Sequence, residues 1–144
     1  MIVPGEWIHH TDGTLLPIVP IFVDLPDGRQ LELDFLLDTG AERTVLTYSD
    51  LMKLETECEP SDEVLAGVGG TSRAVRVDQP LKFRKSDGEF VALNGPFLAF
   101  ADPIALDLSV LGRDILGHFA VIVDKPKRAV MLLHGGHDYR VIAA

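Results

Sequence analysis

Short apolar segments separated by turn residues run through most of the chain, and this pattern restricts the possible folds more than any other feature. Most of the segments are about four to ten residues long, which is the length of strands. They lie at 14–25, 30–37, 43–48, 81–84, 90–93, 97–101, 120–124 and 128–133. Helix-like patterns are confined to 49–55, where Ser49 can cap the first turn, and to the residues after Gly112. We therefore expect an all-β, closed barrel-like domain with one or two short helices.

Two stretches carry residues that disturb a regular strand. Pro17 and Pro20 interrupt 14–25, which predicts an edge or irregular strand, because proline cannot donate to a sheet ladder. In 58–77, two strand-like arms flank the sequence "GVGG". Because a glycine-rich tip can adopt positive φ and flex, we expect a β-hairpin there with a flexible tip.

Charge and cysteine content exclude several classes of function. The formal net charge of −9 argues against binding to nucleic acid or to an anionic membrane surface, because both attract clusters of Lys and Arg. Cys58 is the only cysteine, so neither an internal disulfide nor a cysteine metal cluster can form. With no signal-peptide pattern at the N-terminus, these features predict a cytoplasmic protein.

Asp38 stands at the end of an apolar run, in "FLLDTGAERTVL" (35–46). It can be a turn residue, since Asp readily hydrogen-bonds backbone two residues on and glycine allows a tight turn. It can also be a reactive group, because a carboxylate at the end of a buried strand is costly unless it is bonded or paired. The tight loop between two apolar segments favours chemistry. The Asp-Gly pairs at 12–13 and 87–88 follow no apolar strand and indicate exposed turns.

Three segments together resemble the motifs of the retropepsin-like, or retroviral-type, aspartic proteases. "LLDTGA" (36–41) resembles their active-site loop, and "AGVGGTS" (66–72) resembles the glycine-rich flap that closes over the substrate. "VLGRDIL" (110–116) resembles the segment that packs behind the loop. Their order and spacing also match, and the resemblance spans residues 14–134. It implies one domain over 1–144, with the acid-protease fold of the single-domain, homodimeric branch.

The resemblance also implies a role for each residue of these motifs. Asp38 would be the catalytic acid and base, Thr39 would bond across a dimer axis, Gly40 would let substrate approach, and Ala41 would line the cleft. Gly67, Val68, Gly69 and Gly70 would form the flap tip. Arg113 would lie buried behind the loop and pair with Glu42, which stands where the retroviral enzymes usually have aspartate.

The chain offers only one such loop, whereas peptide hydrolysis by this route needs two carboxylates that share a proton. We therefore expect a C2 homodimer to which each copy contributes Asp38. The favoured function is an aspartic endopeptidase acting on peptides or proteins. The alternatives are a non-catalytic dimerisation or peptide-binding module of the same fold, and an unrelated β-barrel. No cofactor or metal is expected, although His134, His137 and Asp138 could in principle hold one.

Overall fold

The computed structural model describes residues 1–67, 70–103, 106–135 and 142, and these form mainly short strands. The strands are β1 (Ile2–Pro4), β2 (Glu6–His9), β3 (Leu15–Asp24), β4 (Gln30–Leu37), β5 (Val45–Leu46), β6 (Glu59–Gly67), β7 (Gly70–Val77), β8 (Leu81–Arg84), β9 (Phe90–Leu93), β10 (Phe97–Phe100), β11 (Ser109–Leu111), β12 (Ala120–Asp124) and β13 (Ala129–Leu133). The helices are α1 (Tyr48–Lys53) and α2 (Arg113–Leu116). The all-β prediction is confirmed.

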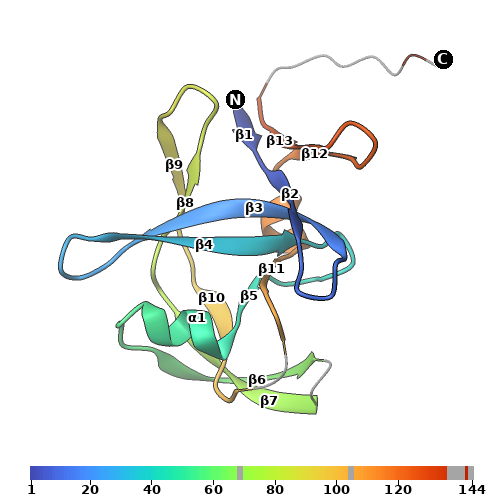
Figure 1. The fold of residues 1–144 in the computed structure, drawn as a ribbon. Helices are drawn as coiled ribbons and strands as arrows, with labels where there is room; N and C mark the ends of the chain where they lie inside the picture. Colours follow the sequence, from blue (N-terminus) through green and yellow to red (C-terminus); the bar gives the residue numbers. More distant parts are fainter. Residues whose placement is uncertain (68–69, 104–105, 136–141, 143–144) are drawn as a thin grey trace.

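The strands form a large sheet and a small one. In the large sheet the order is β6-β7-β10-β5-β11-β4-β3-β8-β9, and β2 also pairs with β3. The small sheet has the order β1-β13-β12. Figure 1 shows β3 and β4 crossing the middle of the molecule, with the small sheet above them and the β6–β7 hairpin below. Within the described residues the ladder of the large sheet runs between two ends, β6 and β9, and does not close on itself.

The strand that contains Pro17 and Pro20 is interior, so the prediction of an edge strand is wrong. β3 pairs with β4 from Ile18 to Asp24 and has two partners on its other side. β2 pairs with 15–18 and β8 pairs with Ile21 and Phe22. Pro20 lies where β2 has ended and β8 has not begun, so a missing N–H interrupts no ladder on that side.

Thr47, not Ser49, caps α1. Its Oγ1 accepts a hydrogen bond from the N–H of Asp50 at 3.1 Å, and its own N–H donates to Ser109 Oγ at 3.0 Å. The chain therefore turns into the helix at Thr47, and β5 is shorter than the segment 43–48 that the apolar pattern suggested. A threonine hydroxyl that binds the first-turn N–H is a preferred helix cap.

The first nine residues contribute two strands that the sequence pattern did not indicate. β1 pairs with β13, so that Val3 lies opposite Leu132, and Val3 is buried. β2 pairs with the start of β3. The segment is divided by Pro4 and Gly5, which hides its strand character. The fold therefore begins well before residue 14.

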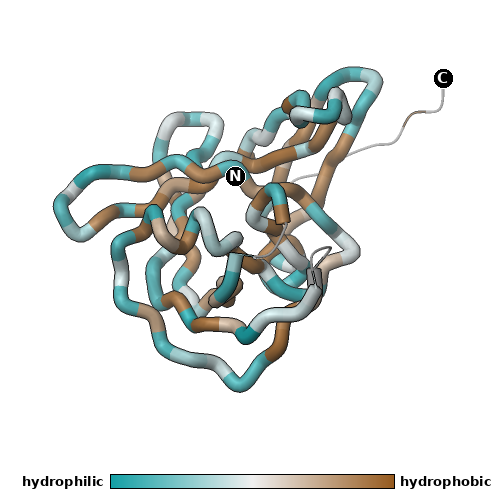
Figure 2. The backbone as a smooth tube through the Cα atoms, turned by 60° about the horizontal axis from the view of Figure 1, so that its bottom comes forward, coloured by the Kyte–Doolittle hydropathy of each residue, from teal (hydrophilic) through white to brown (hydrophobic). Residues whose placement is uncertain are grey.

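Strand β4 carries the core directly to the predicted catalytic loop. Leu33, Phe35 and Leu37 alternate toward the core, where they pack with residues of β3, β8, β11 and α2. Figure 2 shows hydrophobic stretches along the strands and hydrophilic residues at several hairpin turns. Burying a large aliphatic or aromatic side chain contributes about 1.5–3 kcal/mol, so the position of residue 37 is firmly fixed. Asp38 follows at once.

On the other face of β4, Asp34 is half-buried, and we expect Asp34→Asn to stabilise the protein at pH 7. Burial, and then the charge of Asp50, raise the pKa of Asp34 above its ordinary value of 3.8. The folded state therefore favours the protonated form. Its contribution to stability is present below pH 3.8 and is lost as the pH rises through the raised pKa. Urea unfolding of both proteins at pH 7 should show the gain, which should vanish near pH 3.

Asp24→Asn, on the same hairpin, is the matched control with the opposite sign. Lys82 donates hydrogen bonds to Asp24, and they lower the pKa of that carboxyl. The charged form is favoured in the folded state, so this substitution should destabilise at pH 7 and lose its effect in acid. If Asp34→Asn stabilised equally at both pH values, the electrostatic explanation would be wrong.

Candidate functional site

The loop of residues 38–41 is a tight turn anchored to the neighbouring strand. The N–H of Asp38 donates to the carbonyl of Leu111 at 3.2 Å, and the N–H of Ala41 donates to the carbonyl of Asp38 at 3.2 Å. Asp38 Oδ1 accepts a hydrogen bond from the N–H of Gly40 at 2.8 Å. Asp38 and Ala41 are half-buried, whereas Thr39 and Gly40 are exposed. The carboxylate is thus held by its own loop at the protein surface.

The hydrogen bond within the turn does not distinguish Asp38 from other turn residues of the protein. The same hydrogen bond, from a carboxylate to the N–H two residues on, occurs at Asp12, Asp27 and Asp87. Those three lie in exposed hairpin turns. Asp38 differs because it follows a buried strand and its backbone is bonded to β11. The fold therefore holds the backbone of Asp38 more firmly than that of the aspartates in the three hairpin turns.

The segment that begins at Gly112 packs directly behind the loop. The N–H of Arg113 donates to the carbonyl of Ala41 at 2.9 Å, and the N–H of Asp114 donates to that of Glu42 at 3.2 Å. A Cβ atom on Gly112 would lie 2.5 Å from the backbone carbonyl atoms of Arg43. Glycine is therefore required at 112 because two backbones touch there.

Thr44 and Asp114 join the two segments through side chains, and the sequence motifs did not single out this pair. Asp114 Oδ1 accepts hydrogen bonds from the N–H of Thr44 at 2.9 Å and from its hydroxyl at 2.7 Å. Thr44 Oγ1 in turn accepts one from the N–H of Gly112 at 3.0 Å. Thr44 is buried, so these bonds are shielded from water. The only indication in the sequence is that Asp114 is an acidic residue in the first turn of the short helix α2.

The predicted ion pair between Arg113 and Glu42 is absent from the described part of the chain. Both residues are exposed, so Arg113 is not buried behind the loop in a single copy. Their backbones, rather than their side chains, hold the two segments together. Arg43 instead pairs with Glu63 of β6, with Nη2 3.5 Å from Oε1.

Sheet topology gathers these loops at one end of four adjacent strands. β4 and β11 run parallel, with Leu37 opposite Leu111, and β5 runs antiparallel to β11. β10 runs parallel to β5. The residues that follow β4 and β11 and those that precede β5 and β10 therefore share one edge. Asp38, Gly112 and Arg43 all lie on it, and the β6–β7 hairpin joins the sheet beside β10 (Figure 1).

The segment predicted to be the flap folds into the β6–β7 hairpin. Gly67 pairs with Gly70, while Val68 and Gly69 lie outside the described residues. Near its Gly67–Gly70 end the hairpin is tied to the loop after β10, since Ser72 Oγ donates to Asp102 Oδ2 at 2.8 Å. The pairing register shifts between Pro60 and Val64. The hairpin thus has two long arms, with an irregularity in pairing near the start of β6.

Within the described residues the carboxylate of Asp38 has one hydrogen-bond partner, Gly40, and no ion pair. No group of three or more metal-binding side chains occurs in this part of the chain, and His137 and Asp138 lie outside it. None of the described helices is long and apolar enough to cross a membrane. The site is thus a single carboxylate at an open sheet edge.

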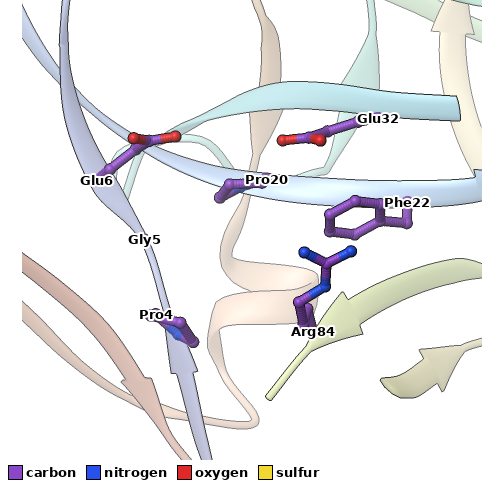
Figure 3. Close-up of a pocket in the computed structure, with 7 residues that line it drawn as sticks. All are labelled: Pro4, Gly5, Glu6, Pro20, Phe22, Glu32 and Arg84. Carbon is purple, nitrogen blue, oxygen red and sulfur yellow. The ribbon is translucent and has the colours of Figure 1, made fainter. Parts of the chain in front are cut away.

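A pocket of about 230 Å³ lies away from this edge (Figure 3). It is lined by Pro4, Gly5, Glu6, Pro20, Phe22, Glu32 and Arg84. The guanidinium of Arg84 lies 4.5 Å from the centre of the Phe22 ring. None of the predicted site residues lines this pocket, so the geometry around Asp38, and not this hollow, defines the candidate site.

Comparisons with known proteins show which family and fold the chain resembles. Residues 23–115 match the family model described as aspartyl protease. A retropepsin-like aspartic protease from Rickettsia conorii is 19% identical, with a TM-score of 0.54 over 93% of this chain and 89% of that chain. The EIAV protease, solved with an inhibitor, is 25% identical, with a TM-score of 0.48 over 76% of this chain and 92% of that chain. No curated protein sequence is significantly similar to the chain.

Proposed function

Because this chain belongs to the aspartyl protease family and has the retropepsin-like fold, we propose that it is an endopeptidase whose catalytic pair consists of Asp38 from each of two copies. One observation carries the proposal. Asp38 is fixed at the end of a buried strand, half-exposed at an open edge, and its carboxylate has no charged partner among the described residues. A second copy across a twofold axis would supply the missing carboxylate.

The chemistry of such a pair follows from its shared proton. Two adjacent carboxylates cannot both ionise, so one is charged and the other protonated. The charged one takes a proton from a water molecule whose oxygen attacks the peptide carbonyl carbon. The protonated one donates its proton to the carbonyl oxygen. The tetrahedral intermediate then collapses as the C–N bond breaks and the leaving nitrogen gains a proton.

The neighbouring residues support this reaction in the proposal. Thr39 is exposed at the loop tip, where its hydroxyl can bond across the dimer axis. Gly40 presents no side chain toward the substrate backbone, and Ala41 lines the cleft. The Gly67–Gly70 end of the hairpin closes over an extended peptide, which adds as a strand between the two copies. Residues 1–144 act as one domain.

Mixing wild type with Asp38→Asn chains tests whether two copies build the site. If they do, mutant chains capture wild-type chains in inactive pairs. Cleavage of a peptide mixture near pH 5 should then fall as the mutant fraction rises at constant wild-type concentration. Adding Asp87→Asn chains, altered only in an exposed turn, should raise activity. An unchanged rate in the presence of excess Asp38→Asn, with exchange of subunits verified by light scattering, would rule out the shared pair.

A further inference from the structure

Arg43 lies on the same sheet edge as Asp38 but two strands away. Asp38 follows β4, β11 lies beside β4, and Arg43 precedes β5 on the far side of β11. Neighbouring strands are about 4.8 Å apart, so the two positions are separated by about 10 Å. An extended peptide advances about 3.3 Å per residue. A substrate held at Asp38 therefore brings a side chain two or three residues away to Arg43.

A pocket of about 340 Å³ opens at this place between Arg43, the β6–β7 hairpin and the start of β10. It is lined by Arg43, Pro60, Ser61, Asp62, Glu63, Arg76, Pro96 and Leu98. The Arg43–Glu63 pair has a separation of 3.5 Å, and the side chains are 45% and 47% exposed. Exposed pairs of this kind contribute little to stability, so a competing carboxylate can replace Glu63.

In the Arg43–Glu63 pair, Arg43 is held in place more firmly than Glu63. The backbone of Arg43 touches Gly112, and the next residue, Thr44, is bonded to Asp114. Glu63 lies on the flap arm, in the stretch where the register with β7 shifts. Movement of the hairpin would therefore carry Glu63 away while Arg43 stays in place.

We propose that Arg43 selects an acidic side chain two or three residues from the scissile bond, and that this carboxylate replaces Glu63 when substrate binds. The inference rests on the proposed protease function and adds a substrate class to it. Arg43 supplies a rigid fork of donors that matches a carboxylate. Arg76 lines the same pocket and adds a second positive charge. In a twofold dimer the pocket occurs on both sides of the cut.

A basic substrate side chain would fit this pocket less well. It could pair with Glu63 or Asp62, but it would also meet Arg43, whose backbone cannot retreat. Asp62 and Glu63 belong to the β6 arm, where the pairing is irregular, whereas the backbone of the positively charged Arg43 is held against Gly112. Like charges brought together in a partly enclosed pocket repel, so lysine should be the least favoured residue there.

The test is a set of otherwise identical peptides with Glu, Gln or Lys at the second and third positions on either side of the cut. For wild type, kcat/KM should favour Glu over Gln by roughly three- to tenfold at one of these positions. Arg43→Gln should remove the preference, and Arg43→Glu should reverse it toward Lys. Glu63→Gln should increase the preference for Glu, because the internal competitor is gone.

The opposite effects of the Arg43 and Glu63 changes separate selection from a structural role. If the pair only held the flap, both Gln variants would lower kcat/KM for all peptides alike. Arg84→Gln, in the distant pocket of Figure 3, is the arginine control and should leave the preference unchanged. No Glu preference in wild type, or one that survives Arg43→Gln, would overturn the proposal.

Peptide binding to Asp38→Asn distinguishes this proposal from failure of the protease function. Calorimetry with the Glu and Gln peptides needs no cleavage. Tighter binding of the Glu peptide that disappears in the Asp38→Asn, Arg43→Gln double variant would support the acidic pocket even if no variant cuts. Equal affinities for the two peptides would overturn it, whatever the catalytic result.

Discussion

Asp38→Asn should reduce peptide cleavage by at least roughly a thousandfold while the protein stays folded and able to associate. Asparagine keeps the oxygen that accepts the hydrogen bond from Gly40, so the turn around residue 38 is preserved. It cannot exchange a proton, so the pair can neither activate water nor protonate the carbonyl. Release of peptide fragments near pH 5, together with circular dichroism and sedimentation, measures both effects.

Asp87→Asn is the matched control for this substitution. Asp87 Oδ1 accepts a hydrogen bond from the N–H of Glu89 at 2.9 Å, the same turn geometry as at Asp38, but in an exposed hairpin. Its activity should equal that of wild type. If Asp38→Asn retained wild-type activity, Asp38 would be only a turn residue. If wild type itself never cut but formed dimers that bind peptides, the non-catalytic module of the same fold would be the better explanation.

The core strands and the loop of residues 38–41 could be predicted because the sequence patterns that indicate them are local. The alternation in 30–37 fixes which face of the strand is buried, and the end of that pattern places Asp38 at the sheet edge. Turn pairs such as Asp87-Gly88 delimit the hairpins at their observed positions. The break at Gly112 likewise separates β11 from α2 as expected.

Features that depend on distant partners were missed or wrongly assigned. The bonds between Thr44 and Asp114 join residues 70 positions apart, and no local pattern signals them. The edge position expected for β3 failed because only the fold shows that β2 and β8 share its second side. The pairing expected between Arg113 and Glu42 is not formed within the described residues of one copy, where both residues are exposed.

The second carboxylate of the proposed catalytic pair is absent from the local sequence pattern for a different reason. A symmetric site repeats one residue, so the sequence contains Asp38 once although the reaction requires it twice. The sequence nevertheless shows that a second copy is required, since the Asp-Thr-Gly triplet occurs only once in it. The partner's contribution can therefore be inferred from chemistry, but its geometry cannot be derived from local pattern.

Gly112→Ala should lower the free energy of unfolding by about 3 kcal/mol or more and should also impair cleavage. The added Cβ would lie 2.5 Å from the carbonyl carbon and oxygen of Arg43 and 3.0 Å from its nitrogen. Backbone atoms cannot rotate away as a side chain would, so the two segments must separate. Separation weakens the bonds of Thr44 with Gly112 and Asp114. Urea unfolding measures the loss of stability.

Gly28→Ala is the control that shows how much of the stability lost in Gly112→Ala comes from the steric clash. Gly28 has a φ of +88° and open space around its Cβ position, so alanine there adds backbone strain without a clash. We expect a cost of about 1 kcal/mol and unaltered cleavage, because the turn lies at the opposite end of β4 from Asp38. An equally mild effect of Gly112→Ala would mean that the loop and the segment behind it can move apart freely. In that case the position of Asp38 would depend on its own turn and on β11 alone, and the support from behind would have no part in holding the carboxylate.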